Sequence, residues 1–135
     1  MDLSNNKINV DQEKDGIWIN IDVDTRIKIA RYLNPNHKRF IQKRLEPYKR
    51  MVRLGTLSKE VEDKVETEAM ANCVLVDWEG LKDGGKDVPY SIKTAEEYLG
   101  DPKLSWFRDL VQETASDLSL FRQSDIEEAT ENVKK

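Results

Sequence analysis

The stretch VDWEGLKDGGKDVPYS, residues 76–91, decides how the second half of the chain is organised, because it separates two segments with helical periodicity. It combines four acidic residues with three glycines. As a phosphate loop it lacks the Ser or Thr that should follow Lys86, and its carboxylates would repel phosphate. As an EF-hand loop starting at Asp77 it has Leu81 and Lys82 where an acidic residue and a glycine belong. The stretch therefore predicts a fixed connection between two helices, with Gly84 and its neighbour free to adopt positive φ.

Aromatic packing, turn residues and a helix cap are predicted to set this connection; the residues are Trp78, Gly80, Gly84, Pro89, Tyr90 and Ser91. Ser91 or Thr94 is predicted to cap the next helix, which ends at Gly100. Asp101 and Pro102 are predicted to open the longer helix that follows.

The N-terminal part of the chain predicts a flexible arm followed by two short strands. Residues 1–15 show no hydrophobic periodicity and are rich in Asn, Asp and Lys. Isoleucines then occupy every second position from Ile17 to Ile21, and alternation returns at Ile27 and Ile29. Because alternate residues lie on one face of a strand, the pattern predicts a small β-hairpin over about residues 16–32.

Helix signals dominate the middle of the chain. Asn34 predicts the cap of a helix that Pro47 should kink and Gly55 should end. Ser58 predicts the cap of a further helix, whose apolar residues recur at four-residue steps towards Trp78.

A last short helix is predicted from the capping pattern at Ser124. The fold class is therefore predicted to be mainly α. One mostly helical domain should cover residues 16–135, with the small β-hairpin at its N-terminal end and residues 1–15 outside it.

Residues suited to catalysis are few. The single histidine, His37, is predicted to be a solvated surface residue, and Cys73 is predicted to pack on the apolar stripe of a helix. The spacing of Cys and His does not match a metal site. The sequence predicts a protein that is not an enzyme, with no catalytic residues, no metal and no cofactor.

Composition indicates a soluble cytosolic protein. The single cysteine excludes an internal disulfide framework, and no apolar run approaches the roughly 20 residues that cross a bilayer. No membrane partner is expected.

Charge is distributed unevenly along the chain. Residues 26–53 carry ten basic residues and one acidic residue, a balance of +9, whereas the rest carries 12 basic and 25 acidic residues, a balance of −13. This asymmetry favours contact with an acidic protein surface or homo-oligomerisation. Nucleic-acid binding by the 26–53 segment is the less favoured alternative, because the pI of about 5.2 is acidic. From charge and aromatic type, the predicted partner contacts are Arg39, Lys43, Arg44, Trp106 and Phe107.

The C-terminal half contains a DWEG step, a glycine turn, VPYS before a short helix, an L-x-D-P pattern and a helix that ends in ASDLSLFR. In these features it resembles the tail assembly chaperones of long-tailed, siphovirus-like bacteriophages. It extends over about residues 16–122 and is most specific over 75–122.

This resemblance implies a cytoplasmic assembly factor of the infected bacterial host that is absent from the mature virion. It implies binding to the tape-measure protein, which is kept soluble, and recruitment of the tail-tube protein. A structural head–tail or tail adaptor protein of the virion is the nearest alternative.

Overall fold

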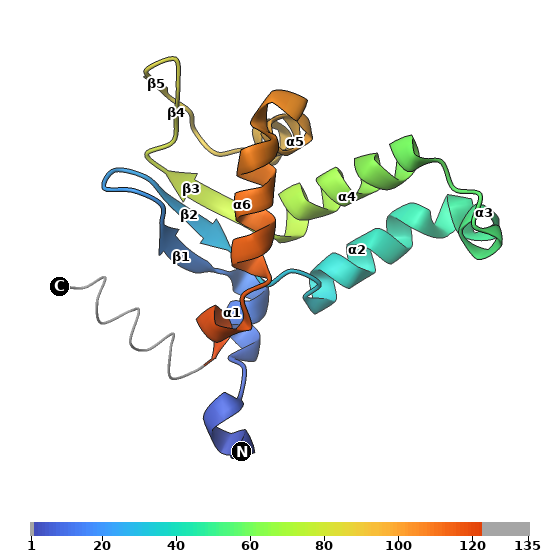
Figure 1. Cartoon of the computed structure of the whole chain (residues 1–135), viewed down its shortest axis with the longest axis horizontal. Coiled ribbons are helices and arrows are strands. Elements are labelled where there is room, and N and C mark those ends of the chain that lie inside the picture. Colours follow the sequence, from blue (N-terminus) through green and yellow to red (C-terminus); the bar gives the residue numbers. More distant parts are fainter. Residues whose placement is uncertain (1, 123–135) are drawn as a thin grey trace.

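A three-stranded antiparallel sheet forms the centre of the molecule. The structure is a computed structural model that describes residues 2–122. Strands β1 (Ile17–Asn20), β2 (Arg26–Ile29) and β3 (Leu75–Glu79) lie side by side in the order β1-β2-β3 (Figure 1). Ile17 pairs with Ile29 and Ile19 with Ile27, so the isoleucines of the first two strands share the face that packs against the core.

The prediction of a mainly α fold with one small N-terminal β-hairpin is wrong. The predicted hairpin is present as β1 and β2, but β3 extends it to a sheet, and β4 (Lys82–Asp83) and β5 (Lys86–Asp87) form a second small sheet. Residues 76–91 lie between α4 and α5, as predicted, but they contain most of a strand and a β-hairpin in place of a simple interhelical turn. The apolar run at the start of β3 fits helical spacing and a buried strand equally well, and its pairing with β2 selects the strand.

Three helices complete the body of the molecule around this sheet. Helix α4 (Lys59–Cys73) packs against α5 (Ile92–Gly100) and β3, and α6 (Ser105–Ala115) packs against α5 and β2 (Figure 1). Short 3-10 helices span Pro102–Leu104 and Leu118–Phe121. The predicted cap at Ser58 is confirmed, and of the two candidates for the next helix Ser91 is the cap; the two hydroxyls accept from the N–H groups of Val61 and Thr94. The buried apolar cluster comprises Ile27, Ile29, Met70, Ala71, Val74, Leu75, Trp78, Ala95, Leu99, Phe107, Val111, Ala115 and Phe121.

A helical hairpin (residues 35–73) projects from this body (Figure 1). It consists of α2 (Pro35–Leu45), a 3-10 turn (Glu46–Tyr48), α3 (Lys49–Leu54) and α4, and α2 packs along α4. The predicted interruption at Pro47 is confirmed by the 3-10 turn, and the predicted stop at Gly55 by its left-handed conformation, with φ of 69°.

The segment before the sheet, predicted to be a flexible arm, contains two short helices. A 3-10 helix spans Leu3–Asn6 and α1 spans Val10–Asp15, where Asn9 caps the helix. Glu13 is buried and pairs with Arg31 at 2.9 Å, and Ile8 forms an isolated bridge with Arg122. These contacts join residues far apart in sequence, which periodicity within residues 1–15 cannot reveal. The helix predicted from Ser124 lies outside the described residues.

Candidate protein-binding surface

Trp78 and Tyr90 hold the segment between β3 and α5 against the body through ring packing and hydrogen bonds. Trp78 is 4% exposed and its indole N–H donates to the Val88 carbonyl at 2.7 Å. The Tyr90 ring meets Trp78 edge to face at 4.9 Å, and its hydroxyl donates to the Leu75 carbonyl at 2.9 Å. Burial is the main cause of the raised pKa of the Tyr90 phenol. Both residues therefore have structural roles and leave little side chain free for a partner.

Gly80 allows β3 to pass close to the turn between β1 and β2. Its φ is +75°, and a Cβ atom at this position would lie 1.8 Å from the carbonyl oxygen of Asp24. Gly84, in the β4–β5 turn, has φ of +61° but open space where a Cβ would be. A side chain at position 80 would therefore clash with the Asp24 carbonyl and would also be strained by the positive φ. At position 84 the positive φ is the only reason that favours glycine.

The other predicted structural residues lie near the N-termini of α5 and α6. Pro89 is exposed and precedes the cap Ser91. The Asp101 carboxylate accepts from the N–H of Lys103 at 2.9 Å, and Pro102 begins the 3-10 turn that leads into α6. The predicted opening of this helix therefore lies one short turn before its α-helical part.

The most prominent exposed aromatic residue is Trp106, at the start of α6. It is 61% exposed and stands between two hollows in the surface. One, of about 370 Å³, lies against the β1–β2 turn and includes Ile21 and Leu110; the other, of about 150 Å³, includes Tyr98 and Leu104. Leu81 lines both. We call Trp106 with these two hollows the Trp106 groove.

Phe107 does not share the position of its neighbour. It is 5% exposed and belongs to the core, with its ring 5.8 Å from that of Trp106. Helical spacing alone predicts that Phe107 is buried and Trp106 is exposed. Phe107 and Val111 are four residues apart on the apolar face of the helix, and Trp106 lies off this face. Of the two aromatic residues predicted to contact a partner, only Trp106 is available at the surface.

The predicted basic contacts lie on a different part of the molecule. Arg39, Lys43 and Arg44 are exposed on α2, in the helical hairpin, whereas the β1–β2 turn that borders the Trp106 groove lies on the opposite side of the body (Figure 1). Arg44 lies 3.6 Å from Glu68 of α4, and its guanidinium lies over the Phe40 ring at 5.0 Å. The structure therefore separates the five predicted contact residues into two surfaces and a core position.

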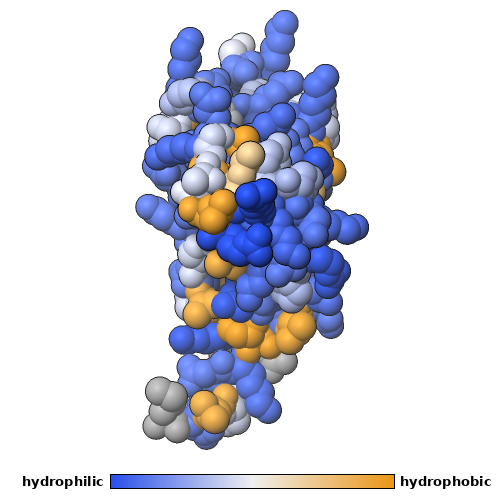
Figure 2. All heavy atoms as spheres, turned by 90° about the vertical axis from the view of Figure 1, so that its right-hand side faces the viewer, coloured by the Kyte–Doolittle hydropathy of each residue, from blue (hydrophilic) through white to orange (hydrophobic). Residues whose placement is uncertain are grey.

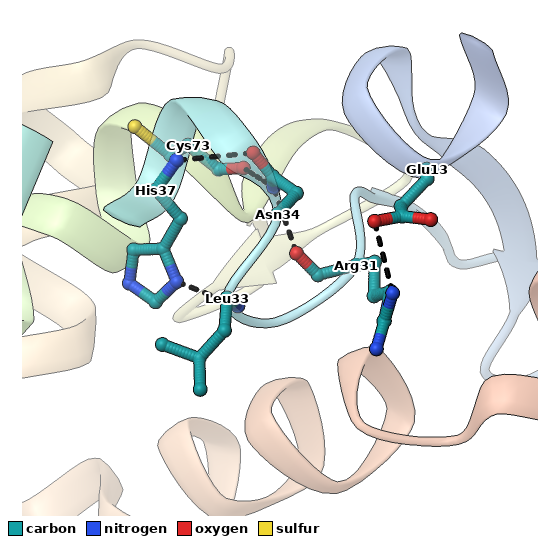
Figure 3. A network of polar contacts seen from close by, with 6 residues as sticks. All are labelled: Glu13, Arg31, Leu33, Asn34, His37 and Cys73. Carbon is teal, nitrogen blue, oxygen red and sulfur yellow. Dashed lines mark hydrogen bonds and ion pairs between the residues drawn. The ribbon is translucent and has the colours of Figure 1, made fainter. Parts of the chain in front are cut away.

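The root of the helical hairpin contains a buried polar network (Figure 3). The Asn34 amide donates to the carbonyls of Arg31 and Cys73, at 2.7 and 3.0 Å, and its oxygen accepts from the N–H of His37. Asn34 thus ties the start of α2 to the end of α4. The His37 ring accepts from the N–H of Leu33 at 2.8 Å, and Leu33 has an unusual positive φ of 62°.

The prediction that His37 is a solvated surface residue is wrong. It is fully buried, and its ring lies 4.9 Å from that of Tyr32. Burial lowers the pKa of His37, although the charge of Glu66 acts in the opposite direction. Its partner is a backbone N–H in an unusual conformation, which sequence alone does not signal.

Groups with potential for catalysis do not converge in the described part of the chain. Burial raises the pKa of the Cys73 thiol, so a reactive thiolate is disfavoured, and its sulfur lies 3.6 Å from the Asn36 carbonyl oxygen. No cluster of His, Cys, Asp and Glu suited to a metal ion occurs within residues 2–122. A polar cleft of about 540 Å³ between α4, α5 and α6 contains charges of both signs, including Glu96 and Arg108. Because acidic and basic residues both line this cleft, its charge favours neither an anionic nor a cationic ligand.

The fold and these surfaces define an α+β domain that presents an exposed tryptophan and a charged helical hairpin. The model of the YdaY prophage protein family matches residues 32–132, which are 101 of the 135 residues. The chain belongs to this family and is a phage-derived protein.

No curated protein and no solved structure matched the chain. Within the described residues, none of the helices has the length and apolar character needed to span a membrane.

Proposed function

We propose that this phage-derived protein is a tail assembly chaperone that binds an apolar helical stretch of the tape-measure protein. The observation that carries the proposal is the Trp106 groove. A 61% exposed tryptophan between two hollows is costly to leave in water, and tryptophan is the side chain most enriched at the energetic centres of protein interfaces.

The groove suits a helix with an apolar face. Ile21 and Leu110 lie in one hollow and Leu104 in the other, so apolar side chains spaced along a helix could enter on both sides of Trp106. Asp22, Asp24 and Lys82 at the rim add polar groups that could orient the partner. The resemblance of residues 75–122 to tail assembly chaperones supplies the choice of partner.

In this proposal the protein acts without catalysis in the cytoplasm of the infected host. It keeps the tape-measure protein soluble, helps recruit the tail-tube protein and is absent from the finished virion. Covering an apolar stripe until tube subunits replace the chaperone would prevent aggregation of a long helical protein.

Co-expression with the tape-measure protein of the same genome tests the proposal. We expect the native chain to keep this partner in the soluble fraction and to co-purify with it. Trp106→Ala should abolish co-purification, whereas Ile92→Ala, which shortens a 45% exposed side chain on α5, should not. An insoluble partner with the native chain, or equal recovery with both variants, would contradict binding at the groove.

Mass spectrometry of purified virions separates the chaperone from the adaptor alternative. The chaperone should be missing from virions, and an adaptor should be present. A native chain found at a fixed stoichiometry in virions would replace the proposal with the adaptor function.

A further inference from the structure

The helical hairpin carries apolar residues that the rest of the molecule does not cover. Within α2 the buried residue is His37, and α3 has no buried residue. Met51, Val52 and Leu54 are 48%, 47% and 62% exposed. Apolar groups also reach the surface as small patches among hydrophilic residues when the molecule is viewed from the side of the hairpin's tip (Figure 2). Two packed helices alone cover only one side of each apolar stripe, which leaves a second side free for a partner.

The two long segments of the hairpin carry opposite charge. Residues 35–54 contain seven basic residues and one acidic residue, a net charge of +6, whereas residues 59–73 contain five acidic and two basic residues, a net charge of −3. One ion pair, Arg44 with Glu68, links the two segments within the described residues. Most of these charges are therefore free to meet another molecule.

We propose that the helical hairpin is a homodimer interface, in which two hairpins pair about a twofold axis as a four-helix bundle. A twofold axis places the basic α2 of one copy against the acidic α4 of its partner, and the same contact is repeated on the other side. A uniformly acidic partner would be attracted by residues 35–54 but repelled by residues 59–73. A second copy matches both segments at once, which is why it is the favoured occupant.

The apolar tip residues add apolar area that this pairing would bury. Met51, Val52 and Leu54 lie beside the basic residues of α3, so the dimer would combine apolar burial with a charged rim, as protein interfaces usually do. The inference goes beyond the proposed function and does not rest on it, because Trp106 lies outside the hairpin.

Charge reversal on one helix at a time tests the interface. The first variant, R39E/K43E/K49E/R50E, changes the net charge of residues 35–54 from +6 to −2, since each reversal removes two charges. The second, E60K/E62K/D63K, changes that of residues 59–73 from −3 to +3. All seven side chains are exposed, and Arg44 is left in place because it pairs with Glu68.

Molar mass is measured by light scattering for each protein alone and for their equimolar mixture. We expect the native chain to be a dimer at low salt and to dimerise more weakly at about 1 M salt, where the Debye length is about 3 Å and the charge pairing is screened. Each variant alone should be a monomer, and the mixture should restore a dimer that contains one copy of each. Circular dichroism checks that each variant is folded.

Two results would overturn the inference: a native chain that is monomeric at all concentrations in low salt, or variants that dimerise as well as the native chain. The double variant M51S/L54S provides a second measurement that keeps all charges. It should weaken dimerisation at least tenfold, and an unchanged dissociation constant would place the interface elsewhere. Trp106→Ala should leave the dimer intact, so failure of this inference and failure of the groove proposal are distinguishable.

Discussion

The body and the helical hairpin differ in where their apolar side chains lie. In the body, residues from β2, β3, α5 and α6, from the C-terminal part of α4 and from the 3-10 helix at Leu118–Phe121 form one cluster that includes the fully buried Ile27 and Phe121. In the hairpin, α3 has no buried residue and Leu54 is 62% exposed. The apolar residues of the body and of α4 are therefore largely buried within the chain, whereas those of α3 at the tip of the hairpin are exposed.

This difference indicates a division of roles between the two regions. The body supplies the free energy that keeps the chain folded, because hydrophobic stabilisation follows the apolar area removed from water. Helix α3, at the tip of the hairpin, contributes little to that free energy, because none of its residues is buried. Substitutions in the body and at the root of the hairpin should therefore affect stability, and substitutions at the tip of the hairpin should affect association.

The largest effect on stability is expected from Trp78→Ala. This change removes a 4% exposed ring together with its hydrogen bond to Val88, and should lower the free energy of unfolding by about 3–5 kcal/mol. Chemical denaturation measures the loss. Trp106→Ala is the matched control and should cost less than about 1 kcal/mol, since Trp106 is largely exposed. Equal costs would contradict the assignment of Trp78 to the body's core.

Gly80→Ala should have the second largest effect. The added methyl group would overlap the Asp24 carbonyl oxygen and would hold an L side chain at positive φ, so we expect a loss above about 2 kcal/mol. Gly84→Ala shares the positive φ but meets open space, and should cost about 1 kcal/mol. Thermal unfolding of the two variants compares them directly, and a Gly84 variant as unstable as the Gly80 variant would rule out the close approach.

A smaller effect is expected from the protonation of His37 at the root of the hairpin. Burial lowers its folded-state pKa below the ordinary value of 6.5. When the pH falls through that value, the unfolded chain binds a proton that the folded chain does not, so the free energy of unfolding decreases. We expect the melting temperature to fall between about pH 7 and about pH 5.

His37→Gln provides the control for this dependence on pH, because His37 is the single histidine of the chain. The variant should be less stable at neutral pH, where it loses the contact with Leu33, but its stability should vary less over the same interval. A variant with the same pH dependence as the native chain would assign the effect to other groups.

The smallest effect on stability is expected at the tip of the hairpin. Leu54→Ser removes an apolar side chain that is 62% exposed, and should change the free energy of unfolding of the isolated monomer by less than about 0.5 kcal/mol. Denaturation at low protein concentration measures this change. A loss comparable to that of Trp78→Ala would show that the tip is part of the core and would remove the contrast between the two regions.

Features decided by local interactions could be predicted from the sequence, and features decided by distant partners could not. Asn34, Ser58 and Ser91 cap helices through hydrogen bonds to residues three positions along the chain. In contrast, β3 is a strand because it pairs with β2, and α1 is held in part by Glu13 and Arg31. A single sequence does not show which distant residues meet.

The candidate site shows the same limit. Trp106 could be nominated from its type and its position off the apolar face of α6, and the structure places it at the surface. The hollows on either side could not be predicted, because they are formed by the β1–β2 turn and the β3–β4 connection, which approach α6 only in the folded chain. For the neighbouring Phe107, residue type predicts a partner contact, whereas helical spacing predicts the core position that the structure shows.

The order of strands in the sheet has a consequence for how this family can diversify. Because β2 and β3 are adjacent and antiparallel, the helical hairpin is topologically one long connection between neighbouring strands. Helices α2 and α4 pack against each other along this connection, so matched helical turns added to both would extend it away from the sheet. Whole helical turns could be gained or lost beyond Asn34 and Cys73 without changing the register of the sheet. The reach of the hairpin is therefore a property that evolution, or a designer, can adjust independently of the body.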